Sequence, residues 1–244
     1  MKILIPVLFT ALSFVANASA AVVLPKNAAP LFDSIQDERV VKNFTGVVTG
    51  GPIHVIVKIG MKEGVRFEGD AEAISTLVTE VKGKVLIIRP KTSWTSWARK
   101  YENKKITAYV TAKDITSLAM SGNGSLTAAS ELTARDFTAT LSGSGSLKAK
   151  VNTDNLTAVI SGSGNLMLSG QADEADVTLS GSGKLSGKDL SLDILSVRIS
   201  GSGSVTAHVE DMIKATISGS GHVYYTGYAS IEEKVIGSGG ITKL

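Results

Sequence analysis

Aromatic and cationic side chains alternate in one short segment of the first half of the chain. The side chains there that could hold a ligand are Trp94, Trp97, Arg99, Lys100 and Tyr101. Cations attract phosphate or carboxylate groups, and an aromatic ring can stack on a sugar or lie at a lipid interface. We therefore predict a binding patch for a glycan, an anionic lipid or an envelope protein at these positions. In the alternative interpretation, the tryptophans cover the end of a hydrophobic core and the cations are simply solvated.

Formal charge also gathers around this segment. The whole chain carries 25 Lys and Arg residues against 22 Asp and Glu residues. The range Lys82–Lys105 alone carries eight basic residues and one acid, Glu102, which gives a balance of +7. An anionic ligand would be drawn to this range. Its binding would weaken with salt, because exposed charges are screened over about 8 Å at physiological ionic strength.

Residues that could do covalent chemistry are present but not arranged for it. The conspicuous serines fall in a repeated Ser-Gly-Ser-Gly motif, whereas a catalytic serine is usually singular and needs a local base. The histidines are His54, His208 and His222, and nothing in the sequence assigns a serine and an acid to any of them. We therefore predict no enzyme and no cofactor. A polysaccharide-active enzyme on a β-helix is the weaker alternative, because it needs acids and bases clustered on one flank.

An aspartate recurs seven residues before most of these motifs. The column comprises Asp114, Asp154, Asp173, Asp193 and Asp211, and Arg135 interrupts it. Stacked carboxylates repel one another, and a calcium ion held by the last four would relieve that repulsion. Aspartate also favours turns, because its side chain hydrogen-bonds to its own backbone. We favour the turn-forming role and predict no metal site, with calcium binding at Asp154, Asp173, Asp193 and Asp211 as the alternative.

The Ser-Gly-Ser-Gly motif sets the period of the elements that must position these residues. It begins at Ser142, Ser161, Ser180, Ser200 and Ser218, with a near copy at Ser121 and a decayed copy at Ile236. The intervals are 21, 19, 19, 20, 18 and 18 residues. An apolar residue precedes each motif, and apolar and polar residues alternate outward on both sides. Such alternation is typical of half-buried strands, and the fixed period indicates a repeat architecture.

The recurring columns favour parallel coils stacked in register over an antiparallel meander of hairpins, because the stack places each residue over its counterpart. We predict an all-β fold, in which residues 116–244 form a parallel right-handed β-helix-like solenoid with the six motif serines in one column. Residues 44–115 precede it as an N-terminal β region, and residues 21–43 form a lead-in segment. A single continuous domain over residues 40–244 is the alternative.

The first 20 residues have the three parts of a secretory signal peptide. Lys2 supplies a positive charge, an apolar run follows, and Ala18-Ser19-Ala20 provides the small residues of a cleavage site. We predict that residues 1–20 are removed between Ala20 and Ala21, so that the chain is exported to the periplasm, the cell surface or the medium. Export separates it from nucleic acid. No later segment has the roughly 20 apolar residues of a transmembrane helix, and the chain has no cysteine for a disulfide or a lipid anchor.

The order of the β-rich segments resembles a known bacterial family. Phe44-Thr45-Gly46-Val47-Val48, His54-Val55-Ile56-Val57 and Lys84-Val85-Leu86-Ile87-Ile88 are followed by the Ser-Gly-Ser-Gly repeats. This ordered set, over residues 40–244, resembles the putative autotransporter adhesins that carry the head GIN domain. The resemblance implies a β-helical, extracytoplasmic protein and supplies no catalytic residues. We expect a non-catalytic binding or adhesin-like protein of the cell envelope or surface, with a structural or lipid-handling periplasmic protein as the alternative.

Overall fold

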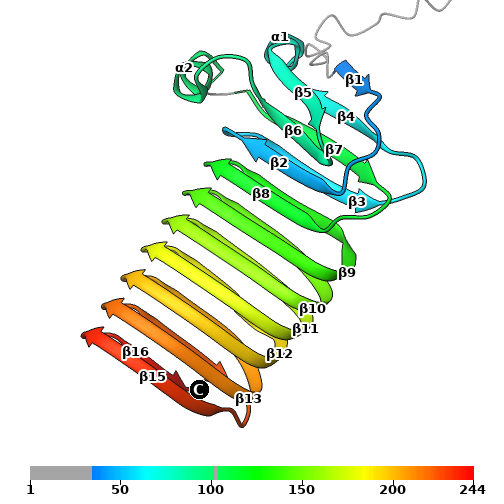
Figure 1. Ribbon diagram of the computed structural model, residues 1–244. Coiled ribbons are helices and arrows are strands. Elements are labelled where there is room, and N and C mark those ends of the chain that lie inside the picture. Colours follow the sequence, from blue (N-terminus) through cyan, green and yellow to red (C-terminus); the bar gives the residue numbers. More distant parts are fainter. Residues whose placement is uncertain (1–34, 102–103) are drawn as a thin grey trace, which may run out of the picture. The chain divides into compact units, whose positions relative to one another are not determined.

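The computed structural model describes residues 35–101 and 104–244 (Figure 1). The predicted signal peptide, its cleavage site at Ala20 and Ala21, and most of the lead-in segment lie outside the described residues. The strands of the described part join in one 16-stranded sheet, which confirms the all-β fold class. Within this part, neither helix has the length and hydrophobicity of a membrane-spanning segment.

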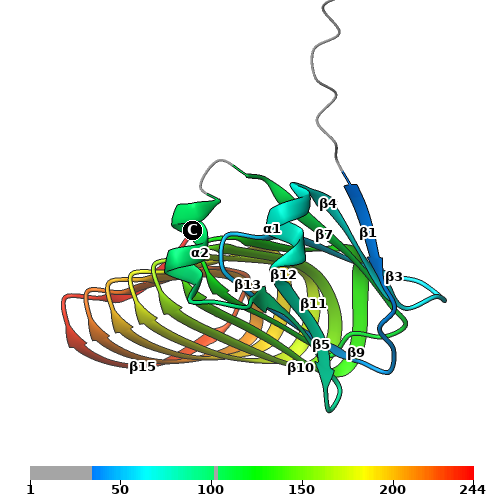
Figure 2. The same ribbon diagram turned by 90° about the horizontal axis from the view of Figure 1, so that it is seen from above.

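Five long strands build the repeat region, and each passes around most of one coil between two motifs. They are β9 (Ser125–Gly143), β10 (Ser146–Gly162), β11 (Asn165–Gly181), β12 (Lys184–Gly201) and β13 (Ser204–Gly219). Consecutive strands pair in parallel, so the coils stack one behind the next (Figures 1 and 2). The result is a parallel β-solenoid of about seven turns, as the repeat period predicts. The parallel register excludes the antiparallel meander for this region.

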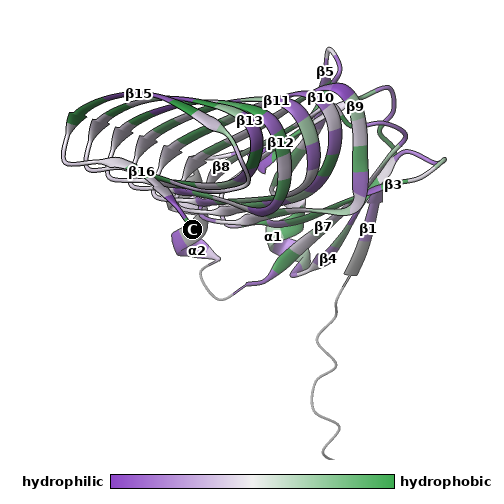
Figure 3. Ribbon diagram, turned by 90° about the horizontal axis from the view of Figure 1, so that it is seen from below, coloured by the Kyte–Doolittle hydropathy of each residue, from purple (hydrophilic) through white to green (hydrophobic). Residues whose placement is uncertain are grey.

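The motif serines align in one column, as predicted. Their backbone partners run in register from Ser121 through Ser142, Ser161, Ser180 and Ser200 to Ser218. The serines face solvent, whereas the apolar residues on either side of the motifs are buried. Hydrophilic and hydrophobic residues therefore alternate along the coils (Figure 3). Each strand has one solvated and one buried side, which is the physical origin of the period-two pattern in the sequence.

The two glycines of each motif are required for different reasons. The first glycine has a positive φ in every coil, between +108° and +123° for the six copies from Gly122 to Gly219. A Cβ atom on Gly181 would lie 2.6 Å from the carbonyl oxygen of Gly162 in the preceding coil. The second glycine is buried, and a Cβ atom on Gly164 would lie 2.8 Å from Leu141 Cδ2. The first position therefore needs left-handed backbone and close approach, and the second leaves room for the core.

A further coil without the motif lies at the N-terminal end of the repeats. It is formed by β2 (Gly46–Gly50) and β3 (His54–Ile59), which pair in parallel with β8 (Ser117–Gly122) and β9. Gly50 stands opposite Ser121, and Gly51 N donates to the carbonyl oxygen of Ser121 at 2.9 Å. The segment Gly50-Gly51-Pro52-Ile53 thus makes the turn that Ser-Gly-Ser-Gly makes elsewhere.

The chain leaves the stack after this coil and returns on its other side. It forms β4 (Gly64–Gly69), α1 (Ala71–Ser75), β5 (Leu77–Lys82), β6 (Val85–Pro90), α2 (Trp94–Lys100) and β7 (Ile106–Ala112) before it reaches β8. β6 and β7 add one more parallel layer beside β2 and β3. β5 and β4 then pair antiparallel with β6 and β7, and β1 (Ile35–Arg39) pairs antiparallel with β4. The coil of β2 and β3 is therefore enclosed between segments that follow it in the chain.

The other end of the stack is formed by β14 (His222–Thr226), β15 (Ser230–Gly237) and β16 (Gly240–Lys243). β15 pairs in parallel with the second half of β13, and β16 pairs in parallel with β14. One cluster of buried apolar side chains extends from Val41 in the N-terminal layers to Tyr225 near this end. The described residues from 35 onward belong to one compact unit with a single core.

Candidate ligand-binding groove

The residues of the predicted aromatic patch lie in or beside α2, and two of its rings are buried. Trp97 is only 3% exposed, and its Nε1 donates a hydrogen bond of 2.7 Å to Thr76 Oγ1. Tyr101 is 5% exposed, with its ring centroid 5.1 Å from that of Trp97. Both rings belong to the hydrophobic core, which is the arrangement that the alternative interpretation of the segment describes. The side chain of Trp94 lies outside the described residues, so binding by this patch stays a prediction that now depends on Arg99 and Lys100.

The positive charge of the surrounding segment is partly neutralised by carboxylates from outside it. Lys100 Nζ lies 2.7 Å from Glu72 Oε1, and Lys104 Nζ lies 2.7 Å from Asp70 Oδ2. The hydrogen bond from Lys100 lowers the pKa of Glu72, and the same bond raises the pKa of Lys100. Lys82 is paired in the same way, with Glu80. Counting charges along the chain therefore overstates the field that a ligand would meet at this segment.

The aspartate column is exposed and does not form a cluster. Asp154, Asp173, Asp193 and Asp211 all face solvent at the bends of successive coils. Asp154 Oδ2 lies 3.9 Å from Arg135 Nε, so the interrupting cation stands beside one of the carboxylates. Among residues 35–101 and 104–244, no three metal-ligating side chains gather closely enough to hold an ion.

One histidine forms a chain of polar side chains that the sequence did not reveal. His208 Nδ1 lies 2.9 Å from Thr226 Oγ1, and its Nε2 lies 2.6 Å from Glu210 Oε1. Thr226 belongs to the neighbouring coil, where it stands in register with His208. The order of hydroxyl, imidazole and carboxylate is that of a hydrolase triad, but a hydrolase also needs a substrate cavity with oxyanion donors. These side chains line neither of the two cavities described for the molecule.

The larger cavity lies at a different place, where three segments of the N-terminal layers meet. These are the connection from β1 to β2, the hairpin loop between β3 and β4, and the end of β7. The cavity has a volume of about 630 Å³. Its lining includes two carboxylates, Glu38 and Glu63, and six cations, namely Arg39, Lys42, Lys58, Lys62, Arg66 and Lys113. We call this cavity, with its balance of +4, the basic groove.

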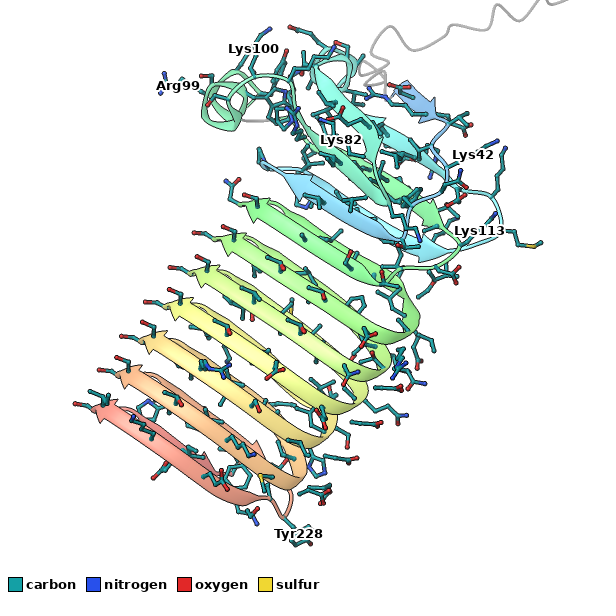
Figure 4. All side chains as sticks on the ribbon, in the orientation of Figure 1. Lys42, Lys82, Arg99, Lys100, Lys113 and Tyr228 are labelled. Atoms are coloured by element: carbon teal, nitrogen blue, oxygen red, sulfur yellow. The ribbon has the colours of Figure 1, made fainter. Side chains whose placement is uncertain are left out.

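The basic groove lies away from the predicted patch on α2. Lys42 and Lys113 project at one edge of the N-terminal layers, and Arg99 and Lys100 project at the other (Figure 4). The smaller cavity, of about 290 Å³, lies between β12, β13 and β15 and has a mixed lining that includes Arg198, Lys214 and Glu232. The lining of the basic groove has six cations against two carboxylates, whereas the lining of the smaller cavity has three cations against two carboxylates.

Two of the six cations have structural partners inside the protein. Arg39 forms an ion pair of 2.9 Å with Asp37, and it also donates to the carbonyl oxygens of Leu77 and Ile74 at 2.8 and 3.0 Å. Arg66 lies 2.6 Å from Glu68 and stacks over the Tyr109 ring, with 4.6 Å from its guanidinium carbon to the ring centroid. These contacts hold the two arginines against the sheet.

The remaining cations of the basic groove are four lysines. Lys42, Lys58, Lys62 and Lys113 form no ion pair with any carboxylate of the described residues. The carboxylate of Glu63, which could have paired with them, accepts the backbone N–H of Asn43 at 3.2 Å. Gathering like charges without counterions is unfavourable, and an anion bound among them would relieve the repulsion. The groove therefore has the electrostatics of an anion-binding site.

These geometric features define a rigid, repeat-built scaffold with a charged groove at one end. The chain matches the family model described as putative auto-transporter adhesin, head GIN domain, over residues 43–229, and it belongs to that family. A comparison with curated proteins finds no match.

Solved structures share the fold at low sequence identity. A putative adhesin from Bacteroides fragilis aligns with a TM-score of 0.76 and 20% identity, covering 86% of this chain and 96% of that one. A putative lipid binding protein from Parabacteroides distasonis aligns with a TM-score of 0.68 and 21% identity, covering 86% and 96%. A putative adhesin from Parabacteroides merdae gives 0.68 and 22%, covering 86% and 95%. At this level of identity the likeness concerns the fold alone.

Proposed function

We propose that this protein is a non-catalytic binding module of the cell envelope or surface, and that it binds an anionic ligand in the basic groove. The observation that carries the proposal is the group of four lysines, Lys42, Lys58, Lys62 and Lys113, around one cavity without carboxylate partners in the described residues. Location outside the cytoplasm follows from the predicted signal peptide.

Three considerations support a binding role. The family is described as putative auto-transporter adhesins, and one protein of the same fold is named a putative lipid binding protein. The strands that carry the groove pair with one another and join the stack through β3 and β9, so the loops that line the groove are held on a fixed frame. Rigid scaffolds that present loops are a common basis of recognition, because little conformational entropy is lost on binding.

Arg99 and Lys100 remain the second candidate site. Arg99 is exposed, and Lys100 is exposed but paired with Glu72. A ligand would have to break that ion pair to bind Lys100, which costs free energy. Arg99 is therefore the better candidate for contacting a ligand. The basic groove is preferred because it offers a cavity as well as charge.

The test is binding of soluble polyanions, with inositol hexakisphosphate and a sulfated hexasaccharide as probes in isothermal titration calorimetry. Replacing Lys58 and Lys113 by glutamine should weaken binding about tenfold or more, since each lysine near an anionic surface contributes about 1 kcal/mol. Raising the salt concentration should weaken binding by the wild type.

A matched control removes the same charge elsewhere. Lys188→Gln with Lys214→Gln changes two exposed lysines outside the basic groove and should leave affinity within about twofold, apart from the general effect of net charge. Equal losses in the two double variants would show non-specific attraction and contradict a site in the groove. A loss confined to Arg99→Gln would instead assign the site to α2.

A further inference from the structure

Exposed apolar side chains stand at the rim of the basic groove. Met61 is 95% exposed and Val40 is 82% exposed, and both line the same cavity as the four lysines. Large exposed apolar residues are few in the described part of the chain. They comprise Val40 and Met61 at this rim, Ile59 at the end of β3, and Tyr228, Ile231, Ile236 and Leu244 in the last coils.

The two rim residues lie close to hydrogen-bonded residues rather than on long free loops. Gly60 N, next to Met61, donates to the carbonyl oxygen of Ala112 at 2.8 Å. The backbone N–H of Asn43 is bound to the carboxylate of Glu63, which ties the connection that carries Val40 to the hairpin loop that carries Met61. The protein therefore keeps both apolar side chains in solvent on an anchored rim.

A soluble anion would need only the lysines of the groove. It would leave Met61 and Val40 in water, where exposed apolar surface is unfavourable. A bilayer with anionic headgroups fits both features, because lysines near the surface attract it and apolar side chains enter its interfacial region. Binding to a bilayer surface strengthens with buried apolar area and with electrostatic attraction to anionic lipids, so the two features would act together.

We infer that the basic groove docks on the surface of an anionic phospholipid bilayer, with its lysines among the headgroups and with Met61 and Val40 inserted between them. This inference rests on the proposed function and specifies the ligand of the same groove. An acidic protein or glycan surface is the competing occupant, and it offers no apolar layer for the exposed rim side chains to enter.

The first experiment is co-sedimentation of the purified protein with vesicles of phosphatidylcholine, with and without phosphatidylglycerol. The wild type should bind only the vesicles that contain phosphatidylglycerol. Replacing Met61 and Val40 by serine should weaken this binding about tenfold, and it should weaken vesicle binding by a larger factor than the binding of inositol hexakisphosphate. Ile236→Ser is the matched control, because Ile236 is 63% exposed but lies in β15, outside the groove.

Each failure has a separate meaning in this design. If the wild type binds inositol hexakisphosphate in the groove but no vesicles, the bilayer inference is wrong and the proposed function stands. If the serine variant binds vesicles as well as the wild type does, the rim does not insert and the inference is also wrong. If neither soluble polyanions nor vesicles bind, both proposals fail.

The absence of cysteine in the chain permits a direct measurement of insertion. A single Met61→Cys substitution can be labelled with an environment-sensitive fluorophore, and Ile236→Cys provides the same label on β15. Addition of phosphatidylglycerol vesicles should shift the emission of the first label to the blue and leave the second unchanged. Equal shifts, or no shift at Met61→Cys with bound vesicles, would overturn the inferred orientation.

Discussion

The turn glycines give the sharpest test of how the coils are held together, and Gly181→Val is the chosen perturbation. Gly181 has φ +112°, a conformation that valine avoids. The new Cβ atom would lie 2.6 Å from the carbonyl oxygen of Gly162, closer than real Cβ contacts allow. Backbone strain of about 1–3 kcal/mol and overpacking of about 1–3 kcal/mol act together, so we expect a loss of about 2–6 kcal/mol.

The loss should be observed in urea unfolding followed by far-ultraviolet circular dichroism. Because each coil contacts only its neighbours, the coils around Gly181 can unfold while the N-terminal layers remain folded. Fluorescence of the buried Trp97, which reports on those layers, should then change at a higher urea concentration than the circular dichroism signal. Wild-type protein should show a smaller separation between the two signals.

Two variants serve as controls for Gly181→Val. Gly240→Val makes the same chemical change where no atom lies within 4 Å of the new Cβ, so its effect should stay within about 0.5 kcal/mol. Ser180→Ala removes an exposed hydroxyl of the serine column and should cost no more than about 1 kcal/mol. Equal stability of Gly181→Val and the wild type would refute the argument from close coil packing.

The remaining predictions concern the N-terminal layers. Trp97→Ala should destabilise the protein by about 3–5 kcal/mol in urea unfolding, because it empties a buried site and removes the N–H that donates to Thr76 Oγ1; unchanged stability together with lost ligand binding would show that the ring serves a ligand instead. The pKa of Glu72 is lowered in the folded protein, chiefly by its hydrogen bond to Lys100, from an ordinary value of 4.5. Its stabilising contribution is therefore present above pH 4.5 and is lost as the pH falls further, and Glu72→Gln should reduce the slope of stability against pH in that acid range; an unchanged slope would contradict the assignment.

The repeat region could be predicted from the sequence because its physics is one-dimensional. Stacking in register places like residues over like, so the serine, glycine and apolar columns appear directly as a sequence period. The coil of β2 and β3 could not be predicted from the repeat period, because Gly50-Gly51-Pro52-Ile53 makes the same turn with different residues. A turn needs suitable backbone geometry and space, and several residue combinations supply both.

The sequence predicts an anionic ligand but not the location of the basic groove. The linear charge count favoured Lys82–Lys105, but the fold brings Asp70 and Glu72 to two of its lysines. The lysines of the basic groove are spread along the chain from Lys42 to Lys113, so no sequence window contains them all. Their proximity arises because β4 to β7, which separate two neighbouring coils in the sequence, pack on the far side of the coil of β2 and β3, a long-range feature with no local signal.

Amide hydrogen exchange with and without inositol hexakisphosphate is the sharpest test of anion binding in the basic groove, because it locates the ligand without any substitution. Exchange should slow in the loops that line the basic groove, over residues 40–43, 58–66 and 109–113, and should stay unchanged in α2 and in the serine turns. Protection confined to residues 94–100, or to the Ser-Gly-Ser-Gly column, would contradict anion binding in the basic groove.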